Sequence, residues 1–151
     1  MEVTITSHCR GFVLLDRIGT IDENIINGAV FLPNNVPLFW VIEAMAQLGG
    51  MHARFMHDFN LHVFLLKINR LDFLSQITGK GWYFLWAELR AASDKAFSYR
   101  VRMTSPQDST LAEGMFCFAS RDYDHVFQED KLKNHYKELF TCLRTNSNGV
   151  C

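Results

Sequence analysis

The stretch "GAVFLPNNVPLFWVIEAMAQLGG", residues 28–50, joins two prolines to a long apolar segment that carries one carboxylate, Glu43. Proline is favoured in the first turn of a helix, and the apolar segment that follows Pro37 contains no proline. The sequence therefore predicts a helix over residues 37–55. Because this segment is apolar on nearly all sides, we expect a helix that is buried on most of its faces.

Two features of the predicted helix need a physical reason. Burying an ionised glutamate costs several kcal/mol unless the carboxylate is paired, hydrogen-bonded or protonated, so Glu43 either faces water or serves chemistry. Gly49 and Gly50 weaken a helix, and in a buried helix such small residues predict the close approach of another backbone.

The rest of the chain supplies strands and one more helix. Residues 11–21 have the pattern of a strand or strand pair. Four later strand-length runs, separated by Gly, Asp, Ser or Pro turns, occupy residues 63–73, 81–93, 96–105 and 110–120. Residues 130–144 have apolar side chains at helical spacing and predict a C-terminal amphipathic helix. A long apolar helix followed by antiparallel strands is an α+β plan in which the sheet must wrap the helix, which describes the hotdog fold.

Composition limits the classes of function. The chain has 151 residues, 21% of them charged, and a net charge of -1. This length suits one domain, and the scattered Lys and Arg form no basic stripe, so nucleic acid is not an expected partner. Aromatic residues reach 13%, which suggests an apolar cavity, a large oligomeric interface or simply rich packing.

Cysteine spacing and hydropathy bear on the compartment. Cysteines stand at positions 9, 117, 142 and 151 and form no C-x-x-C pair, which argues against a structural zinc site and a dense disulfide framework. We therefore expect unpaired cysteines and a cytoplasmic protein. Neither a signal-peptide pattern nor an apolar run of about 20 residues is present, so no membrane span is expected.

Three segments can be compared with a known family. "SHCRGFVLLDRI" (residues 7–18) contains a run in which His8, Phe12, Leu14, Asp16 and Arg17 match the opening of the 3-hydroxyacyl-acyl-carrier-protein dehydratases. "IEAMAQ" (42–47) resembles the central-helix signature of these FabZ-like lyases of fatty acid biosynthesis, and "LAEGMFCFA" (111–119) is similar to their last strand. We therefore expect a hotdog dehydratase-like domain over residues 1–123, followed by a C-terminal helical extension and tail over residues 124–151.

The resemblance implies how such a site would work. It implies a hotdog dimer with active sites at the subunit interface, each combining a histidine from one chain with an acidic residue from the partner's central helix. The expected ligand is a thioester of acyl carrier protein or coenzyme A, with no metal and no cofactor. Glu43 falls on the family's acidic position, so a catalytic origin is one interpretation of its carboxylate. The other is local hydrogen bonding to Gln47, one helical turn away.

The histidine of the family pattern has no counterpart here. Counting back without gaps from Glu43 places Ala29 at the histidine position, and alanine cannot accept a proton. His52 is a poor substitute because it lies on the opposite face of the helix from Glu43. We expect His8 to cap or pack the first strand, and His52, His57 and His62 to be solvent-exposed or in loops.

Several apolar side chains are candidates for a substrate tunnel. We expect Phe31, Leu38 and Trp40 to form its mouth and wall, with Gln47 beside the carboxylate. Leu38 takes the place of a family glycine whose amide meets the thioester carbonyl.

Three functions remain open. The first is a dehydratase-like subunit with impaired activity that binds acyl thioesters as a homodimer or supports an active paralogue in a heterodimer. The second is an active dehydratase that uses Glu43 with an unforeseen base. The third is an acyl thioesterase that uses one carboxylate and water. We favour the first, because loss of a general base slows chemistry without abolishing binding.

Overall fold

The computed structural model describes residues 13–145. Its elements, in chain order, are β1 (Arg17–Ile21), β2 (Ile25–Leu32), α1 (Leu38–Met56), β3 (His62–Phe73), β4 (Gly81–Ala92), β5 (Ala96–Thr104), β6 (Thr110–Arg121) and α2 (Glu129–Thr145). The predicted long helix, the four later strands and the C-terminal helix are all present. Within the described part of the predicted strand, residues 13–16 precede the sheet and the strand runs over Arg17–Ile21.

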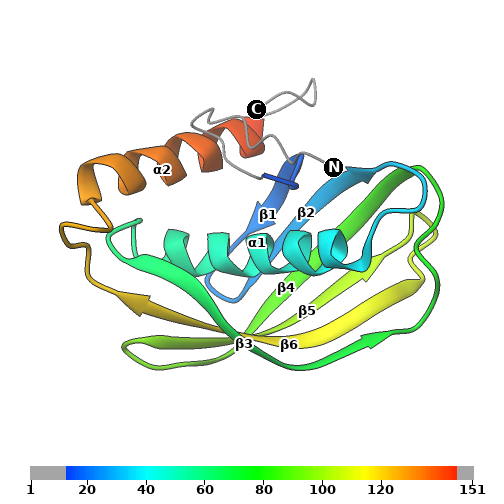
Figure 1. Ribbon diagram of the computed structural model, residues 1–151, viewed down its shortest axis with the longest axis horizontal. Coiled ribbons are helices and arrows are strands. Elements are labelled where there is room, and N and C mark those ends of the chain that lie inside the picture. The colour runs from blue at the N-terminus through cyan, green and yellow to red at the C-terminus, as the bar shows by residue number, and fades with distance from the viewer. Residues whose placement is uncertain (1–12, 146–151) are drawn as a thin grey trace.

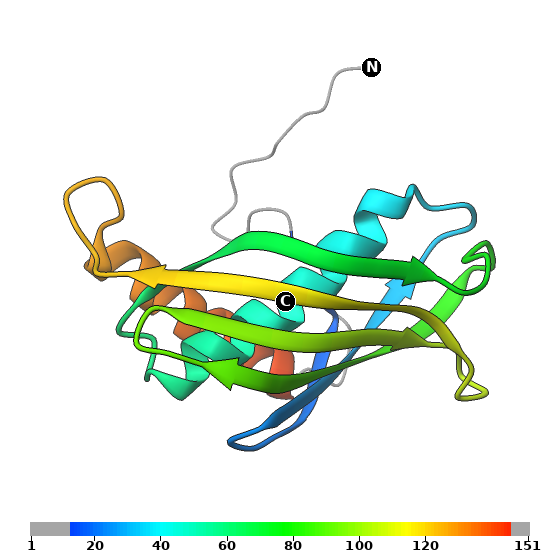
Figure 2. The same cartoon turned by 90° about the horizontal axis from the view of Figure 1, so that it is seen from below.

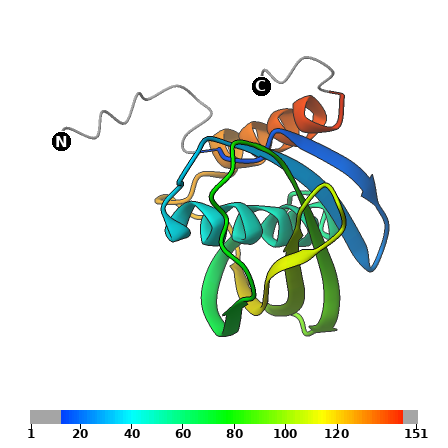
Figure 3. The same ribbon diagram turned by 90° about the vertical axis from the view of Figure 1, so that its right-hand side faces the viewer.

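The six strands form one sheet in the order β1-β2-β4-β5-β6-β3, with antiparallel pairing between all neighbours. The sheet curves around α1 (Figures 1 and 3). The hotdog architecture predicted from the sequence is therefore confirmed. The strict alternation of β5 is also confirmed, since Phe97, Tyr99, Val101 and Met103 are buried against the helix side of the sheet.

Strand β3 occupies a position that its place in the sequence does not indicate. It does not pair with β4, which follows it, but with β6, so β3 forms one edge of the sheet (Figure 2). The chain enters α1 from β2 and leaves it for β3, and these two strands lie on opposite sides of the sheet centre. Helix α1 therefore connects two strands, β2 and β3, that are not neighbours in the sheet.

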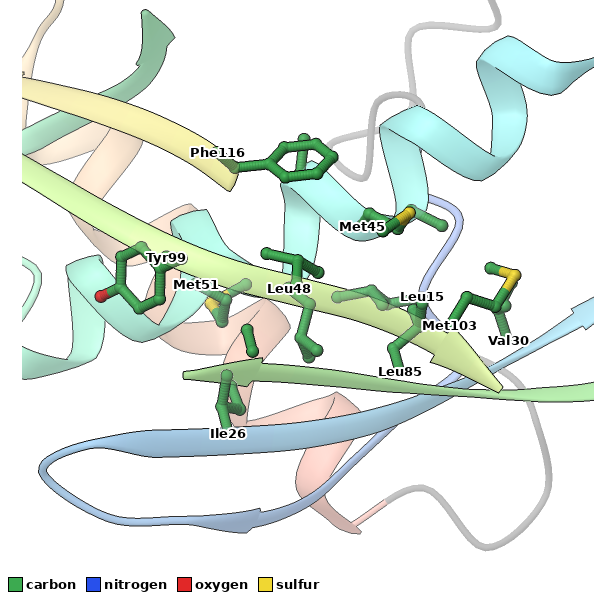
Figure 4. Packing of buried hydrophobic residues seen from close by; sticks show 14 of the residues in the cluster. Leu15, Ile26, Val30, Met45, Leu48, Met51, Leu85, Tyr99, Met103 and Phe116 are labelled. Atoms are coloured by element: carbon green, nitrogen blue, oxygen red, sulfur yellow. The ribbon is translucent and has the colours of Figure 1, made fainter. Parts of the chain in front are cut away.

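The core lies between α1 and the concave face of the sheet. Leu48 and Met51 of α1 pack in one buried cluster with Tyr99 of β5 and Leu85 of β4 (Figure 4). This packing explains why the helix sequence is apolar on nearly all sides.

Gly49 is small for a reason that differs from the predicted one. A Cβ atom at this position would lie 2.9 Å from Cε2 of Phe118 on β6, and a Cβ at Gly50 would lie 3.0 Å from Nη1 of Arg54 and 3.4 Å from Cε1 of the same ring. The close neighbours are therefore an aromatic side chain and a guanidinium, and the expected approach of another backbone is wrong.

Helix α2 covers the side of α1 that faces away from the main part of the sheet (Figure 3). Leu139 and Leu143 are buried, and the Phe140 ring stacks on Phe55 of α1 with centroids 5.2 Å apart. The helix runs antiparallel to α1 (Figure 1). The α1 surface that the sheet leaves open is thus covered in part by the C-terminal segment, whose boundary at residue 124 stays a prediction.

Two expectations about the environment can be compared with the structure. Within residues 13–145 no helix is long and apolar enough to span a membrane. Cys117 is a free thiol, but Cys142 is disulfide-bonded, so the expectation of unpaired cysteines is wrong at position 142. The cytoplasmic location remains a prediction.

Candidate functional site

Glu43 and Gln47 form a hydrogen-bonded pair on α1. The Gln47 side-chain amide donates from Nε2 to Oε1 of Glu43 at 2.9 Å. Its Oε1 accepts the backbone N–H groups of Leu14 at 2.8 Å and Leu15 at 3.4 Å. Gln47 therefore fixes the Glu43 carboxylate and at the same time holds the segment before β1 against the helix. The i,i+4 contact predicted from the sequence is present.

One oxygen of the carboxylate stays available. Within residues 13–145, Oε2 of Glu43 has no hydrogen-bond partner, and the half-buried side chain lines a cavity. An oriented carboxylate with a free oxygen can accept a proton, donate one when protonated, or position a water molecule.

The cavity lies between α1, α2 and the start of β3 and has a volume of about 260 Å³. Helix α1 contributes its two charged lining residues, Glu43 and Arg54, and between them Ala46, Gln47, Gly50 and Met51. The other lining residues come from the N-terminal segment, β3, β6 and α2: Val13, Leu15, Val63, Phe64, Leu65, Phe118, His135, Tyr136, Leu139 and Leu143. A mostly apolar wall with a few polar groups is typical of a small-molecule site.

Arg54 marks the other end of the cavity along α1. Its Nη2 donates to the backbone carbonyl oxygen of Val63 at 2.7 Å, and its guanidinium lies 3.9 Å from the centre of the Tyr136 ring. Burial lowers the pKa of Arg54, while the nearby tyrosines act in the opposite direction. Arg54 was not predicted as a site residue, although a single cation in an apolar helix is the same kind of signal as the single carboxylate of Glu43.

The predicted tunnel residues do not lie in this cavity. Phe31 is 42% exposed and packs edge-on against Trp82 with ring centroids 5.5 Å apart. Leu38, at the start of α1, is 54% exposed, and Trp40 is half-buried. Within the described chain only Gln47 among the proposed substrate-binding residues lines the cavity beside Glu43. The tunnel formed by the other three stays a prediction.

Ala29 lies in the middle of β2 rather than in the loop before α1. A Cβ at Gly28 would approach Cδ1 of Leu48 at 3.0 Å, so position 28 faces α1. Since successive side chains of a strand point to opposite faces, Ala29 points away from α1 and Glu43. Its role as the equivalent of a catalytic histidine therefore stays a prediction. Whatever the register, the loop over residues 33–37 contains no histidine.

The histidines occupy environments that the sequence did not predict. His52 was expected in solvent or in a loop, and this is wrong, because its side chain is 0% exposed. Its Nδ1 lies 2.7 Å from the Tyr99 hydroxyl and its Nε2 2.8 Å from the Asp22 carbonyl oxygen. Burial lowers the pKa of His52, opposed by the contacts to Asp22. His8 lies outside the described residues, whereas His135 of α2 lines the cavity and was missed.

Among known proteins, solved structures share the fold of this chain, and these structures include proteins of different activities. No protein-family model matches the sequence, and no curated protein is matched by it. Solved structures do match. A putative thioesterase from Lactococcus lactis is 11% identical with a TM-score of 0.63, covering 72% of this chain and 91% of its own.

Two further structures resemble this chain. A protein from Streptococcus mutans, solved with acetyl-CoA bound, is 8% identical with a TM-score of 0.64 over 74% of this chain and 91% of its own. The dehydratase heterocomplex ApeI:P from Xenorhabdus doucetiae is 15% identical with a TM-score of 0.64 over 76% of this chain and 86% of its own. The chain therefore has the hotdog fold, which thioesterases and a dehydratase share.

Proposed function

We propose that this protein is an acyl-thioester-binding hotdog subunit of the dehydratase type, with impaired dehydration of its own. The observation that carries the proposal is the Glu43 carboxylate. Gln47 holds it in place at the wall of a mostly apolar cavity, and one of its oxygens has no hydrogen-bond partner within residues 13–145. A thioester placed there would have its chain in apolar surroundings and its polar end near the carboxylate.

Dehydration of a 3-hydroxyacyl thioester requires a base at the α-carbon and an acid at the β-hydroxyl. Glu43 can supply one of these functions. Among the described residues that line the cavity, the only imidazole belongs to His135. Its neighbour Tyr136 covers Arg54, and Arg54 lies about 16 Å along the helix axis from Glu43 at about 1.5 Å per residue. His135 is therefore remote from the carboxylate, which supports slow dehydration.

A thioesterase is the second candidate. Hydrolysis of a thioester can proceed with one carboxylate that activates a water molecule, and the free oxygen of Glu43 suits that role. Thioesterases among the structures with the same fold also favour this candidate.

We further propose that the subunit works as a dimer, with itself or with an active paralogue. Strand β3 is twelve residues long and forms an edge of the sheet. It exposes Phe64, Leu65 and Leu66. A long edge strand with exposed apolar side chains is a surface that proteins normally pair or cover. Pairing with a related chain is supported by the similarity to a dehydratase heterocomplex.

Binding and turnover should be measured together. Calorimetry with saturated and 3-hydroxyacyl thioesters of coenzyme A and acyl carrier protein should detect binding. Absorbance of the enoyl product should report slow dehydration, and a thiol reagent should report hydrolysis. In Glu43→Gln, which preserves the shape of the pair, the residual turnover should fall about 10²–10⁴-fold while binding persists. Glu88→Gln, which removes a partly exposed carboxylate of β4 that does not line the cavity, is the matched control.

Each outcome separates the candidates. Rapid dehydration would overturn the impaired subunit in favour of an active dehydratase, and rapid thiol release would favour the thioesterase. A failure of every thioester to bind, across several chain lengths and both carriers, would reject the proposed function as a whole.

A further inference from the structure

Arg54 is a half-buried cation that has no carboxylate partner among the described residues. Within residues 13–145 its guanidinium forms no ion pair, and its Nε is buried without a hydrogen-bond partner. The Val63 carbonyl oxygen accepts one of its five N–H groups, and the Tyr136 ring covers one face. Burying a charge is costly unless it is paired, so the arrangement lacks an anion.

The missing anion can reach Arg54 through the cavity. Arg54 lines the same cavity as Glu43, and the α1 lining residues between them are Gln47, which is hydrogen-bonded to Glu43, and then Ala46, Gly50 and Met51. A Cβ added at Gly50 would lie 3.0 Å from Nη1 of Arg54, so the glycine allows the guanidinium to lie against α1 at the cavity wall. A ligand that extends from Glu43 toward Arg54 would therefore pass the Gln47 amide, cross an apolar stretch of the wall and end at the N–H donors of the guanidinium.

Helix α2 closes this path. It contributes His135, Tyr136, Leu139 and Leu143 to the cavity wall. The Tyr136 ring over the guanidinium keeps Arg54 away from bulk solvent, which strengthens its interaction with any anion that enters. The surface of α1 that the sheet does not cover and the facing side of α2 therefore form opposite walls of the cavity.

We infer that the cavity selects acyl thioesters whose chain ends in a carboxylate, with the thioester near Glu43 and the terminal carboxylate on Arg54. This inference rests on the proposed function and names its substrate class. A planar guanidinium binds a carboxylate through two parallel hydrogen bonds, a geometry that lysine cannot reproduce. The spacing of Glu43 and Arg54 suits medium chains, because about 16 Å of helix axis separates their Cα atoms and both side chains reach inward.

The test compares matched ligands on the unmodified protein. Calorimetry should use coenzyme A thioesters of about six to about twelve carbons, ending either in a methyl group or in a carboxylate, a range that the helix spacing sets. The carboxylate-ended member of a pair should bind about ten- to a hundredfold more tightly, the effect of hydrogen bonds to a charged group. The same pairs on pantetheine, which lacks the phosphates of coenzyme A, should show the same preference.

Variants then assign the effect to Arg54. Arg54→Gln should abolish the preference while leaving methyl-ended thioesters bound, and Arg54→Lys should restore only part of it. Arg144→Gln removes an exposed cation from α2 that does not line the cavity, and should leave the preference unchanged. Thermal melts of each variant show whether it is folded, and the comparison of ligands on the unmodified protein does not depend on any variant.

The outcomes distinguish this inference from the function on which it rests. Equal binding of both chain types by the unmodified protein would overturn the inference and leave thioester binding intact. A preference that vanishes on pantetheine would also overturn it, because recognition of the terminal carboxylate by Arg54 does not depend on the carrier. Absence of binding for every thioester would instead reject the proposed function.

Discussion

Replacing Tyr99 by phenylalanine removes one hydroxyl group from a fully buried pair. The Tyr99 hydroxyl lies 2.7 Å from Nδ1 of His52, and Nε2 of His52 lies 2.8 Å from the carbonyl oxygen of Asp22. A carbonyl oxygen only accepts, so Nε2 carries the proton of the neutral ring. Nδ1 is then the acceptor, and the Tyr99 hydroxyl donates to it. The substitution Tyr99→Phe therefore leaves a buried acceptor without its donor.

The expected cost follows from this geometry. The phenyl ring still fills the core, so almost no cavity forms, and the loss is that of one unsatisfied buried nitrogen, about 1–3 kcal/mol. For a protein of this size each kcal/mol lowers the melting temperature by about 2–4 °C. Because neither Tyr99 nor His52 lines the cavity beside Glu43, thioester binding should be unchanged.

Urea denaturation followed by tryptophan fluorescence measures this free energy directly. Tyr83→Phe is the matched control, because the Tyr83 hydroxyl donates at 2.6 Å to the carbonyl oxygen of Gly79, an exposed residue to which water has access, in a bond that is only partly buried. The control should lose clearly less stability. If Tyr99→Phe were no more destabilising than Tyr83→Phe at an unchanged denaturant slope, the assigned hydrogen bond would be refuted.

Three further predictions concern stability and assembly. Gly49→Ala should cost about 1–3 kcal/mol in urea denaturation, because its Cβ would meet the Phe118 ring at 2.9 Å. A Cβ at Gly79 would make only an ordinary van der Waals contact, at 3.7 Å from the Tyr83 hydroxyl, so Gly79→Ala should be nearly neutral. Burial lowers the pKa of His52 below its usual value near 6.5. Its contribution to stability is therefore complete above about pH 6.5 and lost as the pH falls; a pH series of unfolding free energies should show this decline, and His52→Gln should flatten it. Leu66→Lys on the exposed edge strand should shift the mass in light scattering toward the monomer, and an unmodified protein that is already monomeric at micromolar concentration would contradict the proposed dimer.

The sequence by itself determined the elements whose signals are local. The helix after Pro37 and the alternating strand at residues 97–103 follow from periodicity, which the backbone geometry of each element imposes on its own residues. The contact between Glu43 and Gln47 is likewise a local feature that the sequence predicts. Residues four apart on a helix are neighbours whatever surrounds the helix, so this half of the candidate site was predictable.

Tertiary structure decided the contacts between elements distant in sequence. The pairing of β3 with β6 rather than β4 depends on how the sheet wraps α1, and no local pattern encodes that choice. His52 is buried because Tyr99 and Asp22 converge on it from distant parts of the chain. Arg54 becomes one end of a cavity only because α2 folds back over α1 and places Tyr136 on the guanidinium. Such contacts form when apolar surfaces of several elements are buried together, so they depend on the packing of the whole chain rather than on any one segment.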